Sequence, residues 1–297
     1  MPYFTRQGVK LHYLDEGQGS AIIFLHEFGG DARSWANQVT DFSLQIDQPM
    51  RCIVLSGRGY LPSDVPESSD AYSWENNRDD ALCLMDFLGL EQVDLIGLSM
   101  GAYIALMLAL HVPERVRSAV CASIGAGAHP PSRQAFIEDA IASAAHIRKT
   151  GVVPARNMAL APNRIQLRLK NEKAWQEFMD NLASHDPVGA ANTLAEVQAK
   201  RPGLQDFADE LARLTVPVLI LAGDEDEPCL DASLWLKRQM PYSGLKLYPR
   251  SGHLLNLEDP FLFHQDIANF HKMVSKAKWQ KRLATPFTSM FSAVDGV

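Results

Sequence analysis

The sequence predicts an α/β fold: a mostly parallel, eight-stranded-type sheet with helices on both faces and an inserted all-helical segment. Three observations support this. Short apolar runs alternate with amphipathic stretches over residues 3–122, the same rhythm resumes near residue 216, and residues 128–213 show helical patterns without a convincing strand. Continuous apolar strands that alternate with helices are typical of a parallel sheet buried on both faces.

The first part of the chain supplies the expected strands in order. They lie at residues 9–14, 21–25, 51–55, 93–96 and 116–121. Asp31 and Ser73 suit the N-cap position of the helices that follow them, and the second of these helices ends near Gly89. An apolar helix is expected directly after the fourth of these strands.

The middle and the end of the chain complete the predicted fold. In the insertion we expect helices over residues 132–149, 163–184 and 186–200. Strands at 216–221 and 245–248 and helices at 230–239 and 259–273 then return to the first pattern. We therefore assign residues 1–127 and 214–275 to a core, 128–213 to a helical lid and 276–297 to a C-terminal tail.

The composition predicts a soluble protein with a large core. Of 297 residues, 46% are hydrophobic, and the net charge of -7 argues against nucleic acid or an anionic membrane as the main partner. The longest apolar run, residues 102–110, is too short for a stable membrane insertion. Four scattered cysteines and the absence of a signal-peptide pattern lead us to expect buried thiols in the cytoplasm.

A Gly-x-Ser-x-Gly sequence stands between a predicted strand and an apolar helix, at Gly97-Leu98-Ser99-Met100-Gly101. In that context the pattern is typical of a nucleophile elbow, a strained turn that presents the serine at a helix N-terminus. Both glycines are expected because a Cβ would collide with a neighbouring element. The alternative is a serine that only caps the helix.

Nucleophilic serine chemistry also needs a base and a carboxylate that orients the base. Each follows a later predicted strand. Four consecutive acids, Asp224 to Glu227, come after the strand at 216–221, and Gly252-His253 follows the strand at 245–248. The order serine, acid, histidine is therefore present, while the position of the acid within its run is open.

These motifs together resemble the α/β-hydrolase superfamily, in its lidded branch of esterases and carbon–carbon bond hydrolases. The resemblance implies the α/β-hydrolase fold and selects Asp226, which fits the Gly-x-x-Asp pattern of relatives, as the acid of a Ser99-His253-Asp226 triad. A serine nucleophile separates the chain from haloalkane dehalogenases and epoxide hydrolases, which use aspartate. The resemblance implies no metal and no cofactor.

The resemblance also points to two backbone N–H groups, those of Met100 and Phe28, as the oxyanion hole. Relatives carry His-Gly-x-x-Gly where this chain has His26-Glu27-Phe28-Gly29-Gly30. Glu27 is expected to face solvent, to pair with an arginine or to modulate catalysis. His26 is expected to be a structural hydrogen-bonding residue, and Gly30 excludes a zinc-protease HExxH motif.

We interpret the protein as a serine hydrolase that cleaves small carboxylic esters or related acyl compounds through an acyl-enzyme. A carbon–carbon bond hydrolase of ring-cleavage products, a cofactor-free perhydrolase and a ligand-binding receptor with little turnover are alternatives. A substrate carboxylate would favour an inward-facing arginine. The candidates in the lid are Arg133, Arg148, Arg156, Arg164 and Arg168. The oligomeric state is not predicted.

Overall fold

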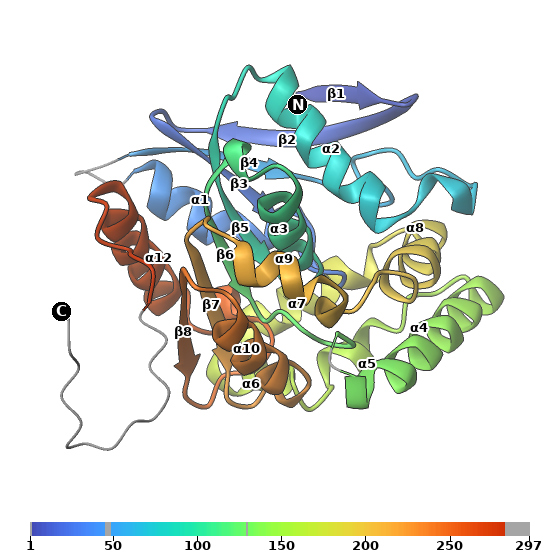
Figure 1. Ribbon diagram of the computed structural model, residues 1–297. Coiled ribbons are helices and arrows are strands. Elements are labelled where there is room, and N and C mark those ends of the chain that lie inside the picture. Colours follow the sequence, from blue (N-terminus) through green and yellow to red (C-terminus); the bar gives the residue numbers. More distant parts are fainter. Residues whose placement is uncertain (1, 45–48, 129, 283–297) are drawn as a thin grey trace.

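The structure is a computed structural model that describes residues 2–44, 49–128 and 130–282 (Figure 1). Within these residues eight strands form one sheet in the order β1-β2-β4-β3-β5-β6-β7-β8. Their bounds are Tyr3–Arg6, Val9–Glu16, Ser20–Leu25, Met50–Leu55, Val93–Leu98, Val116–Ala122, Val218–Gly223 and Ser243–Tyr248 for β1 to β8. β2 is antiparallel to both of its neighbours, and the strands from β4 to β8 are parallel.

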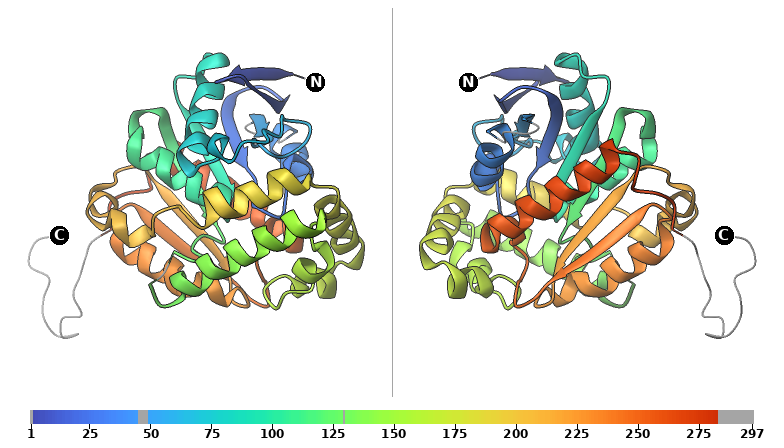
Figure 2. Two further views of the ribbon diagram at one scale, coloured as in Figure 1. Left: turned by 90° about the vertical axis from the view of Figure 1, so that its right-hand side faces the viewer. Right: turned by 90° about the vertical axis from the view of Figure 1, so that its left-hand side faces the viewer.

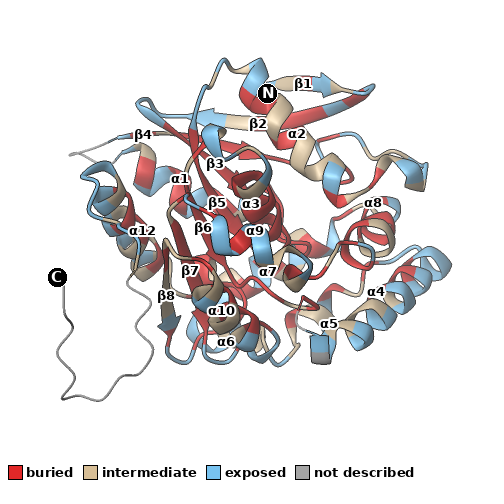
Figure 3. Cartoon of the chain, viewed as in Figure 1, coloured by how far each residue is buried: buried red, intermediate tan, exposed pale blue. Residues whose placement is uncertain are grey.

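Helices cover both faces of this sheet. α1 (Ala36–Ser43) and α12 (Pro260–Ser275) lie over one face, as the right-hand view of Figure 2 shows. α2 (Trp74–Phe87), α3 (Met100–His111) and α10 (Glu227–Gln239) lie over the other. α3 is apolar on all sides and is buried over nearly its whole length, as expected for a helix enclosed by the core. The buried core in Figure 3 follows the central strands and α3.

Between β6 and β7 every described element is a helix. We call residues 130–213 the helical block. Its elements are α4 (Pro130–Thr150), α5 (Ala155–Ala159), α6 (Ile165–Lys170), α7 (Glu172–Ala183), α8 (Pro187–Asn192), a π-helix η4 (Thr193–Gln198), a 3-10 helix η5 (Leu204–Phe207) and α9 (Ala208–Arg213). The absence of a strand from the described part of this segment agrees with the sequence pattern.

Several predicted helix boundaries are wrong. The helix expected over 163–184 is interrupted at Asn171, whose extended backbone ends α6 and whose side chain accepts the Ala174 N–H at 3.0 Å to cap α7. The helix expected over 186–200 becomes a π-helix at Thr193. α10 begins at Glu227 instead of near Leu230, with a proline in its first turn, where the missing N–H costs no hydrogen bond.

The described residues bear on two further expectations. Cys52, Cys121 and Cys229 are buried free thiols, whereas Cys83 is only partly buried. None of the helices in the described ranges is long and apolar enough to cross a bilayer. The cytoplasmic location stays a prediction, and most of the predicted tail, residues 283–297, lies outside the described residues.

Candidate active site

The turn between β5 and α3 presents Ser99 in a strained conformation, with φ of 53° and ψ of -107°. A Cβ on Gly101 would lie 2.0 Å from the Leu25 carbonyl oxygen, and a Cβ on Gly97 would lie 2.3 Å from the Gly101 carbonyl oxygen. Glycine is therefore required at both positions, in agreement with the sequence argument. A left-handed backbone at a serine is costly and is characteristic of functional turns.

The Ser99 side chain does not cap the helix. Ser99 is the N-cap residue of α3, but its hydroxyl makes no capping hydrogen bond. Among the described residues Oγ has no hydrogen-bond partner, and Ser99 lines the same cavity as His253. The alternative of a serine that only caps the helix is therefore not supported.

Asp226 and His253 meet at the carboxyl ends of two adjacent parallel strands. Gly223 at the end of β7 is paired with Tyr248 at the end of β8. His253 Nδ1 lies 2.7 Å from Asp226 Oδ2, and both residues are buried. The other three acids of the run are exposed, so burial and the hydrogen bond single out Asp226.

The helical block also contacts this pair, through Asn163. Its Nδ2 donates to Asp226 Oδ1 at 3.0 Å, and its carbonyl oxygen accepts the His253 backbone N–H at 2.7 Å. Burial raises the pKa of Asp226, but the charge of His253 and the hydrogen bonds from His253 and Asn163 outweigh burial and hold that pKa below its usual range. A Cβ on Gly252 would lie 2.3 Å from the Asn163 carbonyl oxygen, which explains the glycine before the histidine.

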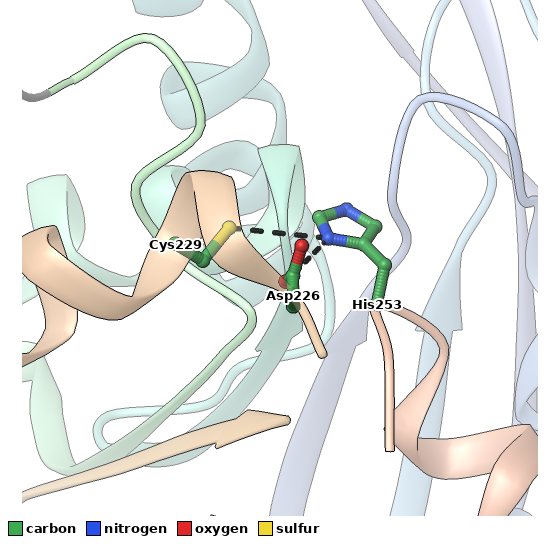
Figure 4. A group of neighbouring side chains, drawn as sticks. All are labelled: Asp226, Cys229 and His253. Atoms are coloured by element: carbon green, nitrogen blue, oxygen red, sulfur yellow. Dashed lines mark hydrogen bonds and ion pairs between the residues drawn. The ribbon is translucent and has the colours of Figure 1, made fainter. Parts of the chain in front are cut away.

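Cys229 adds a buried thiol beside the pair (Figure 4). Its Sγ is 3.9 Å from His253 Nδ1, and the ligand-type atoms of Asp226, Cys229 and His253 lie within 4.8 Å of one another. Two donors around a tetrahedral zinc ion lie roughly 3.3 Å apart when each is about 2.0–2.1 Å from the metal. The 2.7 Å separation of His253 and Asp226 is instead that of a short hydrogen bond.

The two N–H groups expected to form the oxyanion hole belong to neighbouring loops. Leu25 at the end of β3 is paired with Gly97 of β5, which places the Phe28 loop beside the serine turn. Among the described residues, neither the Phe28 nor the Met100 N–H donates to a protein acceptor. The Tyr60 hydroxyl donates to the Phe28 carbonyl at 2.9 Å and holds that peptide in place.

His26 has the structural place expected for it. The Gly57 N–H donates to its Nε2 at 3.1 Å, so the ring proton is on Nδ1, which donates to the Glu27 carbonyl at 2.8 Å. Burial lowers the pKa of His26, which favours this neutral form. His26 therefore ties the Phe28 loop to the loop after β4.

Glu27 is buried and paired with an arginine, so the expectation of a solvent-facing side chain is wrong. Only 1% of its side chain is exposed, and Oε2 accepts Arg164 Nη2 at 2.9 Å. The same Oε2 lies 3.7 Å from His253 Nε2. Oε1 is buried without a hydrogen-bond partner in the described structure. Glu27 thus places a carboxylate beside the Nε2 edge of His253.

A cavity of about 670 Å³ is lined by Ser99, Phe28 and His253, and the helical block supplies most of its wall. Of the five candidate arginines, only Arg164 is among its lining residues. Arg201 lines it as well and was missed, as was Asn163. Arg201 is 4% exposed, and its Nη2 donates to the Ala126 carbonyl at 2.7 Å. Arg201 lies just beyond the π-helix that ends at Gln198, and no helical spacing in the sequence points to it.

Comparison with known proteins places this geometry in context. A family model described as alpha/beta hydrolase fold matches residues 20–260. The chain is 27% identical over 271 residues, 89% of this chain and 95% of the relative, to a putative 2-succinyl-6-hydroxy-2,4-cyclohexadiene-1-carboxylate synthase of Bacillus subtilis (strain 168). It is also 27% identical over 277 residues, 88% of this chain and 90% of the relative, to a 2-hydroxy-6-oxononadienedioate/2-hydroxy-6-oxononatrienedioate hydrolase of Paraburkholderia xenovorans (strain LB400).

Solved structures agree with the fold. A malate-bound thermophilic esterase from Thermogutta terrifontis superimposes with a TM-score of 0.79 at 26% identity, covering 92% of this chain and 97% of the esterase. The similarity therefore extends through the sheet and into the helical block.

Proposed function

The chain belongs to the α/β hydrolase fold family, and we propose that it is a serine hydrolase that cleaves small carboxylic esters through an acyl-enzyme. One observation carries the proposal. Ser99, on a strained turn, lines a cavity together with His253, whose Nδ1 is hydrogen-bonded to the buried Asp226 at 2.7 Å. A nucleophile, a base and an orienting carboxylate are the parts that acyl transfer to water requires.

In the proposed reaction Ser99 Oγ attacks the ester carbonyl while His253 Nε2 takes the hydroxyl proton. Asp226 holds the other ring nitrogen and stabilises the imidazolium. The N–H groups of Phe28 and Met100 donate to the oxyanion, and the N-terminus of α3 also favours its charge. His253 then protonates the leaving alcohol, and it later activates the water that releases the acid.

We propose that the helical block acts as a lid over this site. The block lines the cavity with apolar side chains, and these suit a neutral acyl group. They include Phe136, Ile147, Met158 and Leu194. Apolar side chains beside the oxyanion strengthen the hydrogen bonds to it because they displace water. The domain boundary at residues 128–213 belongs to the same proposal.

A carbon–carbon bond hydrolase with the same triad is the second candidate. A curated relative carries such a name, and a buried cation on the cavity wall favours a substrate with a carboxylate. Arg201 has no carboxylate partner among the described residues, and its Nε is buried and unsatisfied. Burial lowers the pKa of Arg201 to about 10, so it remains a cation at neutral pH.

Labelling with a fluorophosphonate probe tests the serine chemistry. We expect stoichiometric labelling of the wild-type chain and none of Ser99→Ala. Labelling that persists unchanged in Ser99→Ala would exclude the proposal, and an absence of labelling in the wild type would favour a receptor with little turnover.

A substrate panel separates the two candidates. p-Nitrophenyl esters of increasing acyl length are compared with a vinylogous diketone acid, first on the wild type and then on Arg201→Met. Ester turnover that is much faster than carbon–carbon cleavage supports the esterase. Preferential cleavage of the diketone acid, with a KM that rises at least tenfold in Arg201→Met, supports the carbon–carbon hydrolase.

A further inference from the structure

Glu27 is buried in the site, and the reaction proposed above assigns it no role. The loop after β3 is shaped around its side chain. A Cβ on Gly30 would lie 2.7 Å from Ser34 Oγ and 3.2 Å from Glu27 Cγ, and a Cβ on Gly29 would lie 3.3 Å from Glu27 Oε1. These distances are shorter than ordinary van der Waals contacts, so Gly29 makes room for the carboxylate and Gly30 for the Ser34 and Glu27 side chains.

The carboxylate faces the reactive edge of His253. Its Oε2 is 3.7 Å from His253 Nε2, which is too long for a hydrogen bond but within the range in which charges interact strongly. Asp226 occupies the other edge of the ring at 2.7 Å. His253 is therefore held between two carboxylates.

The two protonation states of His253 respond to Glu27 in opposite ways. In the neutral ring the proton on Nδ1 is donated to Asp226, and the lone pair on Nε2 faces the second carboxylate. After Nε2 has taken the proton of Ser99, a positive N–H faces that carboxylate instead. A negative charge at this position therefore favours the protonated ring.

Arg164 balances the charge of Glu27. Without it, a carboxylate one residue before Phe28 would oppose the negative charge that develops at the oxyanion. Arg164 belongs to the helical block, and its Nη2 lies 2.9 Å from Glu27 Oε2. The preceding residue, Asn163, contacts both Asp226 and the His253 backbone. Of these two consecutive residues of the block, Asn163 thus contacts the acid–base pair itself and Arg164 contacts the carboxylate beside it.

We propose that Glu27 and Arg164 are positioning residues that set how readily His253 holds a proton on Nε2. The helical block, through Arg164, thereby tunes proton transfer in the reaction proposed above, on which this inference rests. Removal of the negative charge disfavours the protonated ring, and removal of the positive charge favours it.

Other ionisable groups also face His253. Asp226 is the nearest. Burial raises the pKa of the Cys229 thiol well above its usual range, so the thiol stays neutral. Glu258 accepts the backbone N–H groups on either side of His253, and burial raises its pKa. All three groups are retained in the variants below, so differences between variants report on the Glu27–Arg164 pair.

The test is the pH dependence of kcat/KM with p-nitrophenyl acetate, measured on the full chain. We expect Glu27→Gln to move the acid midpoint down by about one pH unit, the effect of one nearby opposite charge. We expect Arg164→Met to move it up and the double variant to return close to the wild type. Opposite shifts from the two partners are not produced by a general loss of packing.

Asp31→Asn is the matched control. Asp31 is a buried carboxylate of the same loop that also contacts the helical block, through His185 at 3.1 Å. We expect it to lower the midpoint of thermal unfolding and leave the acid midpoint of kcat/KM unchanged. Shifts in one direction for both Glu27→Gln and Arg164→Met, or no shift in either, would overturn the inference. Arg164→Gln replaces Arg164→Met if the latter does not fold.

A readout without turnover separates this inference from the proposed function. The Ser99→Ala chain, labelled with ¹⁵N-histidine, reports the titration of His253, whose signals are assigned by their loss in His253→Asn. The same opposite shifts are expected after Glu27→Gln and Arg164→Met. If wild-type turnover proves independent of Ser99, the proposed function fails, while equal His253 titration midpoints in all variants would overturn this inference alone.

Discussion

The α/β core and the helical block share one apolar cluster but contribute to the site in different ways. The core strands are packed through fully buried apolar side chains such as Ile22, Phe24 and Ile96, all at 0% exposure. The block packs into the same cluster through side chains such as Phe178 and Leu182, and around the site it also meets the core through ion pairs and hydrogen bonds. These join Arg164 to Glu27, His185 to Asp31, Lys170 to Asp259 and Arg33 to Ser184.

The difference separates two tasks. Apolar packing fixes the strand ends that carry Ser99, Asp226 and His253, because close-packed interiors leave few alternative arrangements. Polar contacts depend on charge state and on single side chains, so they respond to pH and to substitution. In our interpretation the core carries the reacting groups and the block adjusts them. The predictions below test that division, from the largest expected effect to the smallest.

The largest loss of kcat is expected for a substitution in the core. Asp226→Asn keeps the shape of the acid but favours the wrong tautomer of His253, and we expect kcat to fall about 10⁴-fold. Glu225→Gln, an exposed acid of the same run, is the control and is expected to retain wild-type kcat. Steady-state measurement of kcat for the two variants tests this prediction. Equal losses in the two variants would remove Asp226 from the proposed triad.

Two glycines, one in the core and one in the block, are expected to differ in how much their substitution lowers the free energy of unfolding. Gly101→Ala forces a Cβ to within 2.0 Å of the Leu25 carbonyl oxygen, and we expect a loss of more than about 4 kcal/mol in the free energy of unfolding. Gly151, after α4 in the block, has φ of +67° and open space around it. Gly151→Ala is expected to cost only about 1 kcal/mol. Comparable losses in the free energy of unfolding for the two variants, measured by urea denaturation, would contradict the rigidity of the Ser99 turn.

Asn163 tests whether the block adjusts the reacting groups. Asn163→Ala removes the hydrogen bond to the Asp226 carboxylate, and bonds to charged groups are worth about 1.5–3 kcal/mol. We expect kcat to fall about tenfold while KM changes less than threefold. The control is Asn181→Ala, an asparagine of α7 that does not line the cavity. A change confined to KM would place Asn163 in substrate binding instead.

The attachment of the block predicts a smaller, pH-dependent effect. Burial raises the pKa of Asp31, but hydrogen bonds from His185 and Arg33 outweigh it and hold that pKa well below its usual range. A depressed folded-state pKa adds stability above the unfolded value of about 3.9, and this stability is lost as pH falls through that region. We expect Asp31→Asn to lower the free energy of unfolding by about 1 kcal/mol at pH 7.

The pH series supplies the check on this prediction. The difference between the wild type and Asp31→Asn should shrink as pH falls below about 4, because the unfolded wild-type chain then takes up a proton on Asp31 while the folded chain, with its lowered pKa, keeps the carboxylate ionised. Asp15→Asn, which removes a more exposed carboxylate paired with Arg51, is the comparison. A difference that is constant from pH 7 to pH 3 would show that charge is not the source of the stability.

The fold class and the strand ends were predictable because their signals are local. Continuous apolar runs mark buried strands whatever lies beside them, and the α/β hydrolase fold with a mostly parallel sheet is confirmed. The glycines around Ser99 are similarly informative, since the turn allows no other residue. The choice of Asp226 came from resemblance, and in the structure it is also the buried acid of its run.

The contacts made by the block could not be predicted, because they depend on how distant segments meet. Helical periodicity runs through residues 163–184 and does not show the interruption at Asn171. Nothing local to Asn163 indicates that its carbonyl accepts the N–H of a histidine 90 positions later. Arg164 was one of five candidate arginines, and only the cavity distinguishes it from the others.

The Asn163 carbonyl has a consequence for protein engineering. The helical block is inserted between β6 and β7, so it is the segment that a chimera with a related hydrolase would exchange. Here the insertion carries a residue that contacts Asp226 and the His253 backbone, and Gly252 leaves space for it. A chimera that replaces the whole block would leave a gap beside the acid–base pair. A chimera built on this core should therefore retain Asn163 and Arg164 of this chain.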